Sequence, residues 1–193
     1  MLLDGASGIT GTRVLPHHSG SDAQWFSHFV GGRICEYLDA SRGIVDSIRL
    51  AVDNSRDYIG EHGVTANEDL FPSSTLVVVS VSGDSVDIVS LGDSPVFTCL
   101  KDGSLVTMSD ARIAELDQAA VDAMVDCSRG CAMTGVQKRA SVNDILLANR
   151  QLKNKPEGYW ILDPTGVALE HLNVMRFCIE DIDYVCAMSD GLE

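Results

Sequence analysis

Two aspartates near opposite ends of the sequence are the first candidates for chemistry. Asp4-Gly5 follows two leucines, and Asp190-Gly191 follows a short apolar stretch, so both segments have the pattern of a strand that leads into Asp-Gly. A carboxylate at the end of a buried strand is held rigidly at a sheet edge, and the following glycine lets the backbone approach a bound ion. Magnesium and manganese prefer carboxylate, carbonyl and water oxygens. Asp4, the carbonyl of Gly5 and Asp190 are therefore suitable ligands if the fold brings them together.

Other chemistries have less support in the sequence. Either Asp-Gly pair, taken alone, is also explained as an ordinary turn. None of the six cysteines lies in a phosphate-binding loop with a following arginine, so we expect no cysteine nucleophile. The five histidines are more simply explained as structural or solvated, and we assign no general acid. The sequence contains neither GxxxxGK[ST] nor GxGxxG, so nothing indicates a kinase or a nucleotide-binding domain.

Four motifs, in order along nearly the whole chain, resemble the protein phosphatase 2C (PPM-type) family. They are DGASG from Asp4 to Gly8, PSST before VVVSV, LGDSPVF from Leu91 to Phe97 with a following KDG, and MSDGLE from Met188 to Glu193. Residues 21–26 and 148–160 look like the bacterial branch of that family. Each motif is weak alone, and their order and spacing together make the resemblance fairly specific.

The resemblance implies an α+β fold, a layered α-β-β-α sandwich of two antiparallel sheets flanked by helices, with a two-metal centre at one end of the sheets. Asp4 would bridge two Mg²⁺ or Mn²⁺ ions, the Gly5 carbonyl would bind one of them, and Asp190 would bind the other. The implied activity is hydrolysis of phosphoserine and phosphothreonine in proteins by a metal-activated water, which needs no protein nucleophile. Asp93 would belong to a mainly structural turn.

The sequence also departs from the family pattern. Many members have a histidine two residues after the bridging aspartate, where this chain has Ala6. Members usually carry a strand with an acidic residue and a phosphate-binding arginine before the first motif, and another metal-binding aspartate after the last. We therefore expect a single phosphatase domain over residues 1–193 that is incomplete at both ends, with the activity belonging to the complete protein.

The elements that must position these residues follow from hydrophobic periodicity. A capping pattern at Ser21 and Gln24 predicts a helix over about 22–39, and a second amphipathic run from Ile44 predicts a helix that ends near Gly63 and packs beside the first. Four strands separated by turn residues predict an antiparallel meander from residue 75 to 108. Further segments complete an α+β pattern: helices at about 111–126 and 141–153, and strands at 158–162 and 184–188.

Composition excludes several classes of partner. A net charge of −14 without a lysine or arginine cluster disfavours nucleic acid, and no apolar run approaches the roughly 18 residues of a membrane span. Scattered cysteines without a CxxC pair suit a cytoplasmic protein and are expected to be small buried hydrophobes. We expect a phosphorylated protein as the substrate, and the sequence leaves the oligomeric state open.

Two alternative functions remain from the sequence. One is a pseudophosphatase, in which the same fold serves as a binding or regulatory module with a degraded metal site. The other is a metal-dependent hydrolase of small phosphorylated metabolites, which relative turnover of phosphopeptides and metabolites would distinguish.

Overall fold

Two helices that pack side by side form the first layer of the fold. The computed structural model describes residues 1–6, 12–38, 42–128, 134, 137 and 142–189. Helix α1 (Asp22–Tyr37) begins after Ser21, whose hydroxyl accepts a hydrogen bond of 3.1 Å from the Gln24 amide, as the capping pattern predicts. Helix α2 (Ile44–His62) runs alongside it, and its end is closed by a 2.7 Å bond from the Gly63 amide to the Ile59 carbonyl. Both predicted helices are confirmed.

The strands form three antiparallel sheets. The first sheet has the order β3-β4-β7, with β3 at Leu76–Ser82, β4 at Ser85–Leu91 and β7 at Asn173–Cys178. The second has the order β6-β5-β8, with β6 at Leu105–Met108, β5 at Val96–Leu100 and β8 at Ile182–Ala187. The third pairs β1 (Gly5–Ala6) with β2 (Ser73–Ser74). Sequence analysis identified no strand at β7.

The predicted four-stranded meander is wrong at its centre. The hairpins β3–β4 and β5–β6 form, but β4 and β5 belong to different sheets. β4 pairs with β3 on one edge and with β7 on the other, and β5 pairs with β6 and β8. Neither strand therefore has a free edge with which to pair with the other. Between them Gly92 adopts a φ of 89°, and the chain crosses from one sheet to the other. Local pattern could not reveal this, because both competing partners come from more than 70 residues further along the chain.

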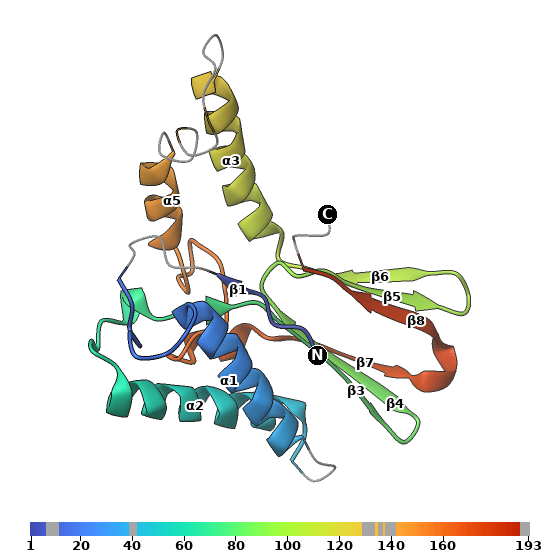
Figure 1. Cartoon of the computed structure of the whole chain (residues 1–193). Helices are drawn as coiled ribbons and strands as arrows, with labels where there is room; N and C mark the ends of the chain where they lie inside the picture. Colours follow the sequence, from blue (N-terminus) through green and yellow to red (C-terminus); the bar gives the residue numbers. More distant parts are fainter. Residues whose placement is uncertain (7–11, 39–41, 129–133, 135–136, 138–141, 190–193) are drawn as a thin grey trace.

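Two hydrophobic clusters define the layers. Leu76 and Val78 of β3 pack against α1 and α2, whereas Val77 and Val79 belong to a cluster between the two three-stranded sheets. Successive side chains of a strand point to opposite faces, so the continuous apolar run in β3 reflects burial on both sides. The order helix, sheet, sheet confirms the α+β class with two facing antiparallel sheets (Figure 1).

The remaining helices lie beyond the end of the sheets. Helix α3 (Ala111–Ser128) extends away from them and packs against α5 (Asn143–Arg150) (Figure 1). The predicted strand at 158–162 is wrong, because this segment makes only isolated bridges. Three short 3₁₀ helices complete the description: Glu68–Leu70, Val167–His171 and Ile179–Asp181. Within the described ranges, no helix has the length and apolar character needed to cross a membrane.

The cysteines differ from expectation. Cys35, Cys178 and Cys186 are exposed, and Cys99 is half-buried, so the prediction of small buried hydrophobes is wrong for three of them. All four are free thiols. Cys35 lies on the outer face of α1. Cys178 and Cys186 follow Phe177 and Val185, which pack between the two sheets, so both cysteines point to the opposite, exposed face.

Candidate functional site

Asp4 lies in an extended segment that is held on both sides of its peptide. Its amide donates to the Thr75 hydroxyl at 3.2 Å, and its carbonyl accepts from the Thr75 amide at 2.9 Å and from the Ser74 hydroxyl at 2.9 Å. Pairing runs from Leu2, opposite Val77, to Ala6, so Asp4 sits inside a paired segment and does not end a strand as expected. The main chain that carries this carboxylate is therefore fixed.

Gly5 has a packing reason to be glycine. A Cβ atom there would lie 2.8 Å from the Ser27 hydroxyl and 2.9 Å from the Ala23 carbonyl, both in α1. Its neighbours Asp4 and Ala6 face the opposite side, as the alternation of a strand requires. Because Asp4 takes the hydrogen-bonded position of the ladder, Gly5 takes the other one, and its carbonyl is directed away from β2. Gly5 therefore lies in the chain segment beside the pocket with its carbonyl turned away from β2.

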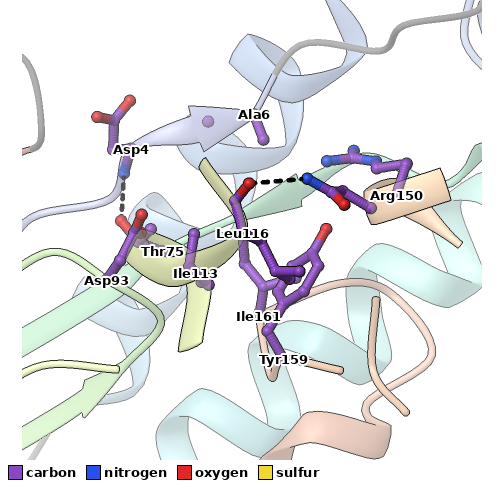
Figure 2. Close-up of a pocket in the computed structure, with 11 residues that line it drawn as sticks. Asp4, Ala6, Thr75, Asp93, Ile113, Leu116, Arg150, Tyr159 and Ile161 are labelled. Carbon is purple, nitrogen blue, oxygen red and sulfur yellow. Dashed lines mark hydrogen bonds between the residues drawn. The ribbon is translucent and has the colours of Figure 1, made fainter. Parts of the chain in front are cut away.

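A pocket of about 210 Å³ opens beside this segment (Figure 2). Its polar lining comes from separate elements: Asp4 before β1, Asp93 after β4, Asn149 and Arg150 at the end of α5, and Tyr159. Apolar walls are supplied by α3 and by Ile161. In Figure 2 the two aspartates lie at one end, and Arg150 lies at the other with the hydroxyl of Tyr159 pointing toward it. The pocket therefore has an acidic end and a basic end.

Asp93, expected to belong to a mainly structural turn, also lies in the pocket lining with Asp4. The two are connected through buried hydroxyls, because Thr75 Oγ1 receives the Asp4 amide and lies 2.6 Å from the hydroxyl of Ser94. The sequence carried a signal for this position, since Leu91-Gly92-Asp93 is a third case of an aspartate at the end of an apolar strand. Its turn role and its pocket position are compatible.

Asp190 lies outside the described residues, as does Gly191. The chain can be followed to Ser189, and the Met188 amide donates to the Pro95 carbonyl at 3.1 Å. Residue 188 is therefore beside the turn that carries Asp93. β8 and Met188 therefore lie beside this turn, and the structure describes the chain no further than Ser189.

The donor set at the acidic end suits a hard cation in part. Two carboxylates and one outward carbonyl supply oxygen ligands, the type that Mg²⁺ and Mn²⁺ take. Within the part of the chain that the structure describes, no three histidine, cysteine, aspartate or glutamate side chains form a metal-binding group. A divalent ion held here would rely on Asp4, Asp93 and the Gly5 carbonyl, with water in the remaining positions.

The basic end was not predicted from the sequence. Arg150 is the last residue of α5, and its guanidinium donates to the Ser73 hydroxyl at 3.0 Å. Ser73 is fully buried in β2. The sequence predicts a helix at 141–153, and residues 148–160 resemble bacterial phosphatases, but helical periodicity gives no reason to single out a residue at a helix end. The contact depends on pairing between distant segments, so local sequence could not reveal it.

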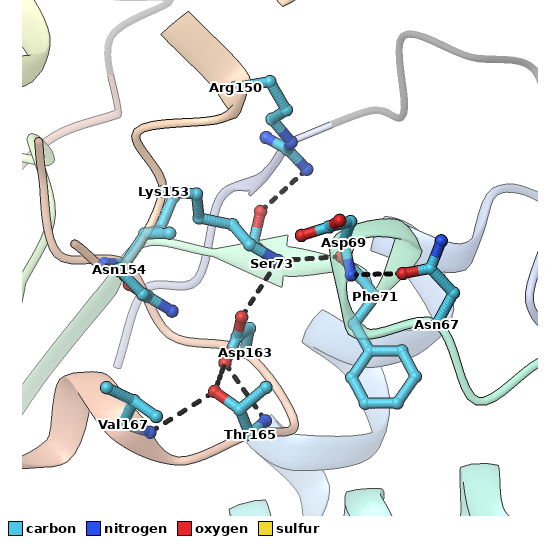
Figure 3. Close-up of polar contacts among 11 residues, drawn as sticks. Asn67, Asp69, Phe71, Ser73, Arg150, Lys153, Asn154, Asp163, Thr165 and Val167 are labelled. Carbon is cyan, nitrogen blue, oxygen red and sulfur yellow. Dashed lines mark hydrogen bonds and ion pairs between the residues drawn. The ribbon is translucent and has the colours of Figure 1, made fainter.

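A buried ion pair fixes the segment that follows Arg150 (Figure 3). Lys153 Nζ lies 2.9 Å from Asp163 Oδ2, and the two side chains are 8% and 1% exposed. Lys153 also donates to the Phe71 carbonyl at 3.3 Å, and Asp163 accepts from the Thr165 amide at 3.1 Å. Arg150 and Lys153 are therefore both tied to the chain around β2 (Figure 3).

Histidines do not line the pocket in the described structure. His18 lies 2.8 Å from the hydroxyl of Tyr58, within an aromatic cluster between α1 and α2. His171 stacks on Trp160 with ring centroids 3.5 Å apart. These contacts give both residues structural roles. Ala6, at the position where the family often has a histidine, contributes only its methyl group to the lining.

The comparison with known proteins neither adds to this description nor contradicts it. The family resemblance therefore rests on the motifs quoted above. No protein-family model matches the chain, and the search of curated proteins gave no significant match.

Proposed function

We propose that this protein is a metal-dependent phosphatase that hydrolyses phosphoserine and phosphothreonine in proteins. The observation that carries the proposal is that Asp4, just before β1, and Asp93, just after β4, are 89 positions apart and line one pocket together with Gly5. Oxygen ligands from separate segments that line one pocket are what the family resemblance implies. The β8 strand leads toward the turn that carries Asp93.

The roles of the residues follow from their chemistry. Asp4, Asp93 and the Gly5 carbonyl would hold a divalent ion, and Asp190 is proposed as a further ligand. When bound, two Mg²⁺ or Mn²⁺ ions supply an activated water and charge neutralisation for the phosphoryl oxygens. Hydrogen bonds to the Asp4 amide and carbonyl fix the backbone from which its carboxylate projects, and the apolar side chains of α3 form one wall of the pocket.

Water fits this site better than a covalent nucleophile. The described residues that line the pocket include neither cysteine nor histidine, and the hydroxyl of Thr75 is engaged with the Asp4 amide and the Ser94 hydroxyl. The exposed thiols of Cys35, Cys178 and Cys186 lie outside the lining, and free thiols favour a reducing compartment such as the cytoplasm. We therefore infer a cytoplasmic enzyme. Its proposed substrate is a phosphorylated protein, as the family resemblance implies.

The test is release of phosphate from phosphoserine and phosphothreonine peptides in about 2 mM MnCl₂, a concentration that should saturate a weak site. The measurement is repeated after addition of excess chelator. We expect turnover that the chelator abolishes. Asp4→Asn should reduce turnover by about 100-fold or more, because the metal loses a charged ligand. Asp84→Asn, in the exposed turn between β3 and β4, is the matched control and should leave turnover unchanged. Turnover that survives chelation would refute the proposal.

Asp93→Asn separates the two roles of that residue. If its carboxylate binds metal, turnover should fall about as far as in Asp4→Asn while the urea midpoint changes little. A lower midpoint with normal turnover at saturating Mn²⁺ would return Asp93 to a purely structural role.

The two alternatives predict different outcomes of the same assay. The pseudophosphatase has a specific point in its favour, since the described residues form no three-ligand group. It predicts no turnover of any phosphate ester, together with binding of phosphopeptide. The metabolite hydrolase predicts that small phosphate esters are hydrolysed faster than phosphopeptides.

A further inference from the structure

Arg150 is the one basic side chain among the described residues that line the pocket. It comes from the last position of α5 and lies across the pocket from Asp4 and Asp93 (Figure 2). None of the ion pairs within the described ranges involves Arg150, although two carboxylates share its pocket. A guanidinium that lines a pocket and is not neutralised by a carboxylate remains available to an anion.

The contact that holds Arg150 leaves most of its donors unused. One terminal nitrogen donates to the Ser73 hydroxyl at 3.0 Å, which is its one hydrogen bond among the described contacts. Guanidinium has five N–H donors in a planar fork that matches two oxygens of a phosphate or carboxylate. Ser73 is fully buried, so it holds one side of the guanidinium and is itself out of reach of a ligand that enters from solvent.

Neighbouring charges make Arg150 the local source of positive potential. The charge of Lys153, three residues further along, is neutralised by its buried ion pair with Asp163. The chain as a whole carries a net charge of −14, which repels an anionic substrate from most of the surface. Among the described lining residues, an anion that enters this pocket therefore meets one cation without an ion-pair partner, Arg150, opposite the two aspartates.

We propose that Arg150 binds the phosphoryl group of the substrate and directs its phosphorus toward the acidic end of the pocket. This rests on the proposed function for the identity of the anion, and it adds a binding residue that no motif in the sequence identified. The Tyr159 hydroxyl, which points toward the same end, would be a neighbour of the bound oxygens (Figure 2). Lys153 and Asp163 would then act as positioning residues for Arg150 through the segment that follows α5.

Binding of inorganic phosphate tests the proposal without requiring turnover. The dissociation constant is measured by calorimetry with Mn²⁺ and again with chelator, for the wild-type chain, Arg150→Met, Arg150→Lys and Arg112→Met. Arg112 is the matched control, because it lies on α3 near the pocket but pairs with Glu115. We expect Arg150→Met to weaken phosphate binding by at least about 10-fold, Arg150→Lys by less, and Arg112→Met not at all.

A structural role for Arg150 predicts a different result. Ser73→Ala removes the hydroxyl that holds Arg150 but keeps the charge, so it should retain more phosphate affinity than Arg150→Met. Circular dichroism and the urea midpoint verify the fold of each variant, and Arg150→Lys serves as the test if Arg150→Met does not fold. Wild-type protein that binds no phosphate under either condition, or equal affinity in wild type and the folded Arg150 variant, would overturn the proposal.

The outcomes also separate this inference from the proposed function. Phosphate binding that depends on Arg150, in a protein that hydrolyses no phosphopeptide, would support the inference and refute the phosphatase. Metal-dependent phosphopeptide turnover with an unchanged KM and unchanged inhibition by phosphate in Arg150→Met would refute the inference and leave the phosphatase standing.

Discussion

Replacing Lys153 by methionine should lower the free energy of unfolding more than a substitution at an exposed residue does. At the 2.9 Å separation of Lys153 and Asp163, two unit charges attract by about 6 kcal/mol at an effective dielectric constant of about 20. Desolvation of both groups offsets much of that gain. Lys153→Met removes the attraction but leaves the Asp163 carboxylate buried at 1% exposure, so the cost should be about 3–5 kcal/mol. That is a large share of a typical stability of about 5–15 kcal/mol.

Urea unfolding followed by circular dichroism and tryptophan fluorescence measures this cost. With an m-value of about 2 kcal/mol per molar urea, a loss of about 4 kcal/mol lowers the midpoint by about 2 M. Lys155→Met is the control, because Lys155 is exposed and two residues away, and it should change stability by less than about 0.5 kcal/mol.

A second variant identifies the buried charge as the cause. Asp163→Asn keeps the oxygen that accepts from the Thr165 amide and removes the charge. The double variant Lys153→Met/Asp163→Asn should therefore be more stable than Lys153→Met alone by about 1 kcal/mol or more. A single variant that costs less than about 1 kcal/mol, or a double variant no more stable than the single, would refute the reasoning.

Three further predictions follow from other contacts. Gly5→Ala should cost about 1–3 kcal/mol in urea unfolding, because its Cβ would lie 2.8 Å from a hydroxyl of α1, whereas Gly32→Ala meets nothing within 4 Å and should be neutral or stabilising. The Arg176 guanidinium lowers the pKa of Asp87 by hydrogen bonding, so the stability difference between wild type and Arg176→Gln should be full above about pH 4 and vanish as pH falls through the lowered pKa of Asp87, measured as urea midpoints across that range. If the phosphatase proposal holds, Mn²⁺ at about 100 times its Kd should raise the unfolding free energy by about 2.7 kcal/mol, and Asp4→Asn should lose that gain.

Periodicity and capping were sufficient for the helices and for most strands. Ser21 and Gln24 defined the start of α1, and the β-branched run after Thr75 defined β3, because these signals act within a few residues. The exposed face of β7 gave no alternation to detect, since nearly all its residues are exposed. Sheet membership of β4 and β5 was decided by β7 and β8, which lie far along the chain, and local pattern does not encode such pairing.

The candidate site was predictable only in part, for the same physical reason. Asp4 and Gly5 could be proposed because an aspartate and a glycine after apolar residues are a local pattern with a chemical use. Asp93 had the same pattern, but its place in a turn was sufficient to explain it until the pocket showed where its side chain lies. Arg150 had no local signal, because its position depends on a hydroxyl 77 residues earlier in the chain.

Three consecutive hydroxyl residues, Ser73, Ser74 and Thr75, make contacts with residues at both ends of the pocket. Ser73 accepts from the guanidinium of Arg150, Ser74 donates to the Asp4 carbonyl, and Thr75 accepts from the Asp4 amide. Ser74 also pairs through its backbone with Leu162 on the side away from β1, so segments from three regions of the chain meet at Ser74. Because side chains alternate along a strand, Ser73 and Thr75 face the pocket side and Ser74 faces α1. All three side chains are buried. Small side chains are required where three backbones meet, and hydroxyls satisfy the polar groups that such close approach would bury. The motif therefore acts by positioning Asp4 and Arg150 at opposite ends of one pocket, and its own hydroxyls are already engaged.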